Sequence, residues 1–164
     1  MTSADAALTH HLAQFNVGAP RFPLDDPRMA GFMSRLDSVN ALADAAPGFV
    51  WRLTGDASND ATDLRHPSLG HQMVNLSVWE SRESLWEYAY RSGHLDLLRQ
   101  RADWFELPSG AHLVLWWVPA GHVPTLDEAV ERLERLHRLG PTQAAFTFRH
   151  FFPSIFVEAM QPKI

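Results

Sequence analysis

The sequence of 164 residues contains no cysteine, which excludes disulfides, thiolate nucleophiles and cysteine-based metal sites. It also lacks any apolar run approaching the roughly 20 residues of a membrane helix. Lys and Arg form no basic stripe, and the formal net charge of -5 opposes binding to phosphate backbones. We therefore expect neither a nucleic acid nor a membrane as partner. The first five residues lack the basic-then-apolar pattern of a secretory signal, so the expected location is the cytoplasm.

Several catalytic fingerprints are missing as well. The sequence has no GxSxG nucleophile elbow, no P-loop, no Rossmann glycine pattern and no HExxH zinc motif. The histidines show no metal-ligand spacing either, since pairs such as His66 with His71 and His112 with His122 do not have the i,i+4 arrangement of zinc proteases. We expect no metal site.

Aromatic residues are the unusual feature of what is present. Apolar residues make up 46% and charged residues 20% of the chain, as in an ordinary globular protein. The length corresponds to a single domain over residues 1–164, with a core at about 10–150 and a C-terminal tail at 151–164. Six Trp and ten Phe are available to line a hydrophobic core or a ligand pocket.

Hydrophobic periodicity predicts the secondary structure. Strands are expected at 12–17, 49–53, 74–79, 112–119 and 145–148. Helices are expected from the Asp26-Pro27 cap to Pro47, from the Ser81 cap to about residue 105, and from the Thr125 cap to Gly140. Gly93 predicts a break or a close approach in the second helix, because a glycine there costs about 1 kcal/mol relative to alanine. Segment 55–72 is too long for a hairpin, and loops of that length are usually functional or mobile.

The order of these elements is β-α-β-β-α-β with an added helix and strand. It predicts a ferredoxin-like α+β fold, with helices on one face of an antiparallel sheet. The strand at 112–119 is apolar on both of its faces, so both must be covered. Two copies packed sheet to sheet would supply the second cover. The sequence therefore predicts a homodimer.

Two segments resemble a known superfamily. Residues 74–81 read Val-Asn-Leu-Ser-Val-Trp-Glu-Ser, and residues 88–94 read Tyr-Ala-Tyr-Arg-Ser-Gly-His. They resemble the third strand and second helix of the dimeric α+β-barrel superfamily, which includes antibiotic-biosynthesis monooxygenases, haem-degrading monooxygenases and spheroidene monooxygenase. The whole chain looks most similar to an uncharacterised bacterial family within it, over about residues 10–150. The runs at 23–31, 47–52, 116–122 and 145–148 carry this second resemblance.

The resemblance implies an activity and part of a site. Haem-degrading members use an Asn on the first strand, with an aromatic residue and a His on the second helix. Asn16 matches the first position and Tyr88 falls near the second, whereas His94 reaches the third only across a gap. Cofactor-independent members oxidise electron-rich aromatic substrates in a pocket between sheet and helices. The resemblance thus implies a monooxygenase-like or cyclase-like enzyme for a small aromatic or hydrophobic substrate, of a kind found in natural-product metabolism.

The candidate site residues follow from both arguments. His94 comes first because histidine titrates near neutral pH and suits general base work, although many helical histidines are structural. Tyr88 and Asn16 complete the predicted catalytic set. The predicted substrate-binding residues are Asn75, Ser77 and Trp79 on the polar face of one strand, with Trp51, Trp117 and Arg91.

Three functional hypotheses stay open. The first is the enzyme just described. The second is a haem-binding or haem-dependent protein with His94 as axial ligand, so haem is the one cofactor that the sequence raises. The third is a non-catalytic homodimer that binds a small molecule. Asp63, Arg65 and His66 in the long loop are either a lid over the pocket or solvated residues.

Overall fold

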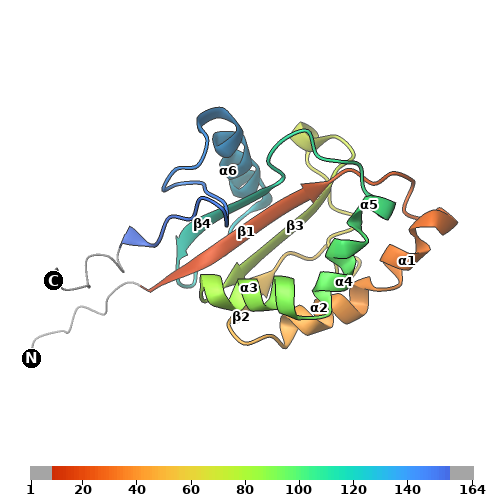
Figure 1. Ribbon diagram of the computed structural model, residues 1–164, viewed down its shortest axis with the longest axis horizontal. Helices are drawn as coiled ribbons and strands as arrows, with labels where there is room; N and C mark the ends of the chain where they lie inside the picture. Colours follow the sequence, from red (N-terminus) through yellow and green to blue (C-terminus); the bar gives the residue numbers. More distant parts are fainter. Residues whose placement is uncertain (1–8, 156–164) are drawn as a thin grey trace, which may run out of the picture.

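A computed structural model describes residues 9–155 of the chain (Figure 1). Four strands form an antiparallel sheet in the spatial order β2-β3-β1-β4. β1 (His10–Gly18) pairs with both β3 (Met73–Trp79) and β4 (Leu113–Pro119), and β2 (Phe49–Arg52) pairs with β3. The predicted α+β fold with β-α-β-β-α-β order is confirmed. Residues 156–164 of the predicted tail lie outside the described part.

The two predicted crossover helices are each divided into short pieces. Between β1 and β2 lie the 3-10 helix η1 (Pro27–Met29), α1 (Ala30–Met33) and α2 (Leu36–Asp44). Between β3 and β4 lie α3 (Arg82–Arg91), α4 (His94–Arg99) and α5 (Arg101–Trp104). A further 3-10 turn, η2 (Pro67–Leu69), interrupts the long loop, and α6 (Leu126–Leu139) follows β4. Within residues 9–155 no helix has both the length and the apolar character needed to cross a bilayer.

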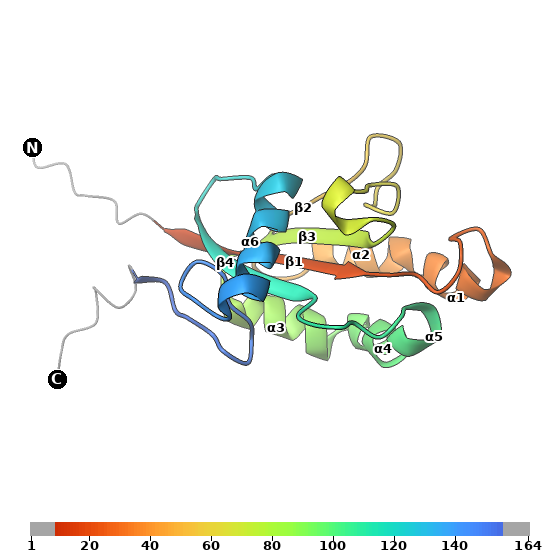
Figure 2. The same cartoon turned by 90° about the horizontal axis from the view of Figure 1, so that it is seen from above.

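The sheet separates two apolar cores, because successive side chains of a strand point to opposite faces. On one face, Val74, Leu76 and Val78 of β3 pack in a cluster with the apolar stripe of α6. On the other face, Trp79 lies in a cluster with Leu85 of α3. Figure 1 shows α6 above the sheet and α2, α3 and α4 below it, and Figure 2 shows α6 lying across the strands.

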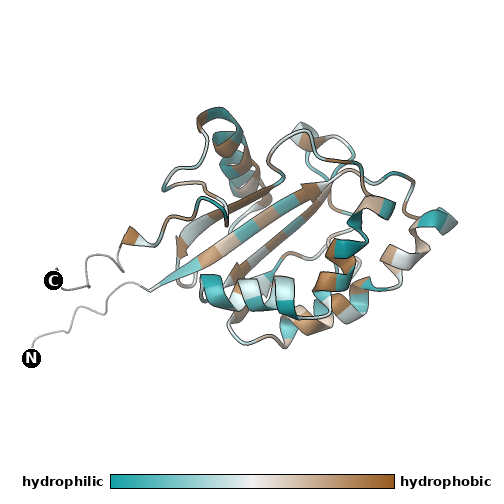
Figure 3. Cartoon of the chain, viewed as in Figure 1, coloured by the Kyte–Doolittle hydropathy of each residue, from teal (hydrophilic) through white to brown (hydrophobic). Residues whose placement is uncertain are grey.

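This arrangement removes the reason for which a homodimer was predicted. α6 and the loop residues Leu64 and Leu69 cover the sheet face that a second copy was expected to cover. Trp116, on that face of β4, is 0% exposed. In Figure 3, brown apolar residues are frequent on β4, whereas teal polar residues are frequent on α3 and α6. The homodimer stays a prediction, without an uncovered sheet face to support it.

The segment predicted as a last strand, 145–148, is not a strand. Only Phe146 pairs with β4, through two hydrogen bonds with the backbone of Leu115 (2.8 and 2.9 Å). The chain turns on both sides of this bridge, since Thr142 bonds to Ala145 and Thr147 to His150. The hydrogen-bond ladder of a β-strand therefore cannot extend beyond Phe146, although the Phe146 side chain is fully buried.

Candidate functional site

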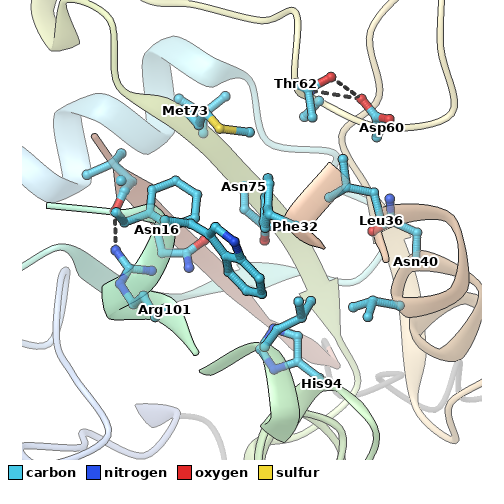
Figure 4. A pocket seen from close by; sticks show the side chains of 18 of the residues that line it. Asn16, Phe32, Leu36, Asn40, Asp60, Thr62, Met73, Asn75, His94 and Arg101 are labelled. Atoms are coloured by element: carbon cyan, nitrogen blue, oxygen red, sulfur yellow. Dashed lines mark hydrogen bonds between the residues drawn. The ribbon is translucent and has the colours of Figure 1, made fainter. Parts of the chain in front are cut away.

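A cavity of about 150 Å³ lies on the lower face of the sheet, between the strands and helices α1 to α5 (Figure 4). Its floor is formed by Asn16 of β1 and Asn75 of β3, which are paired in register. β3 is an interior strand of the sheet, yet Asn75 is exposed. The cavity therefore extends from solvent down to the backbone of the sheet.

One part of the cavity wall is aromatic. Phe32 of α1 packs edge-on against Phe105, with ring centroids 5.1 Å apart and planes at 88°. Trp104, 6% exposed, lies 5.8 Å from the same Phe32 ring. An apolar cavity of about 150 Å³ holds one benzene ring. The enclosed part of this cavity therefore accommodates about one aromatic ring, and a larger ligand would extend toward the open side.

A break in the helix places His94 on the cavity wall. α3 ends at Arg91, and the next residue, Ser92, has an extended backbone (φ -108°, ψ -177°). The Ser92 hydroxyl donates to the carbonyl of Tyr88 and accepts from the backbone N–H of His94 at 3.2 Å. A Cβ atom on Gly93 would lie 2.9 Å from Leu42 Cδ1, so the chain passes close to α2 here. The predicted break at Gly93 is confirmed.

The hydrogen bonding of His94 sets its protonation. Nδ1 lies 3.2 Å from the carbonyl oxygen of Ala89, and because a carbonyl only accepts, Nδ1 carries the proton. Nε2 is then the basic nitrogen, and no residue among 9–155 hydrogen-bonds to it. Burial lowers the pKa of His94 below its ordinary value, and the bond to Ala89 opposes this only in part. At neutral pH the imidazole is therefore neutral and able to accept a proton.

Tyr88 supports the His94 ring from beneath. The two ring centroids are 5.0 Å apart, and Tyr88 also stacks on Trp79 at 5.0 Å with an interplanar angle of 24°. The phenol donates to the carbonyl of Val39 in α2 at 3.3 Å. Burial raises the pKa of the Tyr88 hydroxyl well above its ordinary value. Tyr88 is therefore a neutral phenol whose hydroxyl is already bonded to α2.

Ser77 and Trp79 lie on the same face of β3 as Asn75, farther along the strand, and do not line the cavity. Trp79 Nε1 donates to Ser77 Oγ at 2.9 Å, and both side chains are buried. Ser77 Oγ lies 3.0 Å from the amide of Gln14. In the orientation that satisfies both ends of that amide, the Gln14 nitrogen donates to Ser77 and also to Asn75 Oδ1 at 3.1 Å. These residues therefore orient Asn75 and do not line the cavity themselves.

Three predicted substrate-binding residues lie elsewhere in the fold. Trp51 of β2 packs with the cluster on the opposite face of the sheet. Trp117 of β4 donates from Nε1 to the carbonyl of Phe152 at 2.9 Å. The Arg91 side chain, 71% exposed, pairs with Glu87 at 3.6 Å. None of the three lines the cavity.

The long loop borders the cavity, but through residues other than the predicted ones. Asp60, Ala61 and Thr62 line it, whereas Arg65 bonds to carbonyls of its own loop and His66 pairs with Asp127 of α6 at 2.8 Å. Although burial raises the pKa of Asp60, hydrogen bonds from Thr62 and Ser58 hold it below its ordinary value. The loop thus forms one rim of the cavity.

Arg52 anchors this rim to α2. Its guanidinium bonds to Asp44 at 2.7 and 3.1 Å and to the carbonyl of Asn59 at 2.6 Å. Arg52 was not among the predicted site residues, although it stands on a short strand at the beginning of the loop. Gln14 was missed as well, and the alternation of β1, which puts Gln14 and Asn16 on one face, could have identified it.

Arg101 is the other missed residue of the cavity. Its Nη2 donates to the carbonyl of Val17 at 3.2 Å, and no carboxylate within residues 9–155 forms an ion pair with it. Nothing in the local sequence distinguishes Arg101 from the surface arginines Arg91 and Arg99. Only the packing of α5 against the end of β1 brings it to the cavity.

The cavity does not fit a haem. It encloses about one aromatic ring, whereas haem is a tetrapyrrole macrocycle. His94 is present on the wall, but a macrocycle beside it would extend well beyond the space for one ring and into the open side of the cavity. In the part of the chain that the structure describes, no three His, Asp or Glu side chains are grouped as metal ligands.

The fold and the site together define an α+β protein with a ligand-sized cavity on one face of an antiparallel sheet. Residues 11–160 match the family described as "Domain of unknown function (DUF3291)", and the chain belongs to that family. A search of curated proteins finds no match.

Two solved structures show a similar arrangement. One is a mutant of SnoaB, a cofactor-independent oxygenase from Streptomyces nogalater, at 15% identity and a TM-score of 0.44, covering 69% of this chain and 95% of that chain. The other is NE2512, a protein of unknown function from Nitrosomonas europaea, at 16% identity and a TM-score of 0.42, covering 71% of this chain and 97% of that chain. Similarity at this level of sequence identity and TM-score supports no statement about the reaction of this chain.

Proposed function

We propose that this protein is an enzyme that binds a small aromatic or hydrophobic molecule in the cavity and removes a proton from it with His94 as general base. One observation carries the proposal. A neutral imidazole, with Nδ1 bonded to the Ala89 carbonyl and Nε2 left as the base, lies on the wall of a cavity sized for an aromatic ring.

The rest of the cavity supports this assignment. Phe32, Trp104 and Phe105 supply apolar walls for a ring. Asn16 and Asn75 on the floor carry amide N–H groups that can donate to an oxygen as negative charge develops on it. A proton taken by His94 therefore leaves an anion next to groups that stabilise it.

Two reactions can follow from such an anion. In a monooxygenase reaction, the carbanion adds to dioxygen to give a peroxide anion. This anion takes the proton back from His94, and the resulting hydroperoxide loses water to leave a carbonyl. The balance is one CH₂ group and one O₂ giving one C=O and one water. In a cyclase reaction, the same carbanion attacks a carbonyl of its own molecule. The resemblance of residues 74–81 and 88–94 to oxygenases of the dimeric α+β-barrel superfamily favours the first.

Proton removal is tested with phenylacetone, a one-ring ketone whose benzylic protons are weakly acidic. The protein should accelerate their exchange for deuterium in D₂O, followed by NMR, and His94→Gln should lose most of that acceleration. His122→Gln is the matched control, since His122 is paired with Glu128 at 2.8 Å outside the cavity. Equal exchange rates for the unaltered protein and His94→Gln would remove His94 as the base.

The same measurement separates catalysis from simple ligand binding. A protein that only binds would be stabilised by phenylacetone without exchanging its protons. Oxygen uptake that depends on both the protein and His94 would further favour the monooxygenase reaction over the cyclase one.

A further inference from the structure

Arg101 differs from the other arginine of the cavity. Arg52 is bonded to the carboxylate of Asp44, whereas Arg101 has no carboxylate partner among residues 9–155 and uses one N–H for the carbonyl of Val17. A guanidinium carries five N–H donors. Most of the donors of Arg101 are therefore available to a ligand.

Because Arg101 is partly buried, the absence of a carboxylate partner is energetically unfavourable. The side chain is partly buried, and its guanidinium carbon lies 5.2 Å from the centroid of the Phe105 ring. Burial lowers the pKa of Arg101, and no neighbouring carboxylate opposes that effect. The group remains protonated nonetheless, because its ordinary pKa lies so far above neutral pH. A partly buried cation without a counter-charge is unfavourable, and an anionic ligand would relieve this.

We propose that Arg101 binds the carboxylate of the substrate, so that the molecule on which His94 acts is a small aromatic acid with about one ring. The ring part of this inference rests on the proposed function. The carboxylate part rests on Arg101, since a planar guanidinium matches a carboxylate with two parallel hydrogen bonds.

The positions of the charged groups favour one orientation of such an acid. Figure 4 places Arg101 beside Asn16 on one side of the cavity and Asp60 on the opposite side. The Asp60 carboxylate accepts from the Thr62 hydroxyl at 2.6 Å and from Ser58 at 3.2 Å, so it is already hydrogen-bonded within the loop. The substrate carboxylate then lies at Arg101 and Asn16, and the ring extends between the apolar walls toward His94.

A second hollow of about 290 Å³ also touches Arg101, but it suits an anion less well. It is lined by Glu106, whose carboxylate repels an anion, and by His71 and His112. Burial, together with the nearby charge of Arg101, lowers the pKa of His112. His112 is therefore neutral near pH 7 and adds no positive charge. The first cavity is the site that the proposal assigns.

Benzoate and its uncharged analogue benzamide test the inference. Their binding is measured by calorimetry. Hydrogen bonds to charged groups are worth about 1.5–3 kcal/mol, so benzoate should bind roughly 10- to 100-fold more tightly than benzamide. Arg101→Met should abolish this preference, and Arg101→Lys should keep part of it. Arg91→Met, at an exposed ion pair outside the cavity, should leave it unchanged.

Several outcomes would overturn the inference. Equal affinity for benzoate and benzamide, or an undiminished preference in Arg101→Lys and Arg101→Met, would remove Arg101 as the carboxylate site. Tighter binding of phenyl phosphate than of benzoate would replace the carboxylate with a phosphate. Benzoate should also inhibit phenylacetone exchange competitively, and inhibition of another type would place it outside this cavity.

The failure of this inference can be told apart from that of the proposed function. His94→Gln should keep its preference for benzoate, because His94 is not the carboxylate site. Benzoate binding without any proton exchange in the unaltered protein would disprove the general base and leave Arg101 in place. Proton exchange without a preference for benzoate would disprove the carboxylate site at Arg101 and leave His94 as the general base.

Discussion

Asn16 and Asn75 stand directly opposite each other in the antiparallel pair of β1 and β3, and both line the floor of the cavity. Two amides in the interior of a sheet would be unfavourable under an apolar layer without partners. Here Asn75 is exposed to solvent and Gln14 bonds to it from the same face. Asn16 and Asn75 can therefore occupy interior positions of the sheet because the cavity above them is open to solvent.

Replacing Asn75 should impair the proposed reaction without weakening the fold. Asn75→Ala should change the free energy of unfolding by no more than about 0.5 kcal/mol, because the side chain is exposed. Phenylacetone exchange should fall about tenfold or more, because a donor to the developing anion is lost. Gln143→Ala, an exposed amide that lines neither cavity, is the control for both measurements. A stable Asn75→Ala protein with unchanged exchange would argue against a role for this amide.

Gly48→Ala should be strongly destabilising. Gly48 precedes β2 with φ +80°, and a Cβ atom there would lie 2.5 Å from Ser84 Cβ near the beginning of α3. The matched control is Gly121→Ala, at φ +90° with no atom within 4 Å of the added Cβ. The control should cost about 1–2 kcal/mol for backbone strain, and Gly48→Ala about 1–3 kcal/mol more for the clash. Urea unfolding measures both, and equal losses would mean that α3 can move away from β2 freely.

Arg52→Met should release the loop that borders the cavity. The Arg52 side chain, 11% exposed, joins Asp44 of α2 to Asn59. Its loss should raise amide hydrogen exchange at the Gly55 N–H, which bonds to the carbonyl of Asp60, because local opening becomes easier. Arg28→Met is the control, since the Arg28–Asp26 pair is exposed and does not line the cavity. Equal protection of the Gly55 amide from hydrogen exchange in the unaltered protein, Arg52→Met and Arg28→Met would show that the loop keeps its position without Arg52.

The stability of the protein should fall in mild acid partly through His94. Its pKa in the folded protein is lowered by burial, so as pH drops below about 6.5 the unfolded chain binds a proton that the folded chain does not. The folded state therefore loses stability from about pH 6.5 down to the lowered pKa, and no further below it. His112, also with a lowered pKa, acts in the same direction.

The difference between the unaltered protein and His94→Gln isolates the contribution of His94. The unaltered protein should lose more unfolding free energy between about pH 7 and 5 than the variant does. Phenylacetone exchange should instead persist through this range and decline only as the pH approaches the lowered pKa of His94, because the folded protein keeps the imidazole neutral above it. A larger loss in His94→Gln would mean that the folded protein stabilises the charged form.

The sequence by itself determined the order of the elements and much of the cavity floor. Period-two alternation in β3 assigned Asn75 and Ser77 to one strand face, and the family resemblance singled out Asn16 on β1. Asp26 and Ser81 marked where helices begin. Gly93 marked the break that brings His94 to the cavity. All these features depend on neighbours a few residues away, which is the range over which a local pattern is informative.

Only the tertiary structure decided which element meets which face. α6, and not a second copy, covers the face of β4 that carries Trp116. Trp51 and Trp117 pack away from the cavity, whereas Arg101 reaches it. Periodicity states on which side of its own helix or strand a residue lies. It does not state which distant segment packs against that side, because that depends on the shapes of all the elements together.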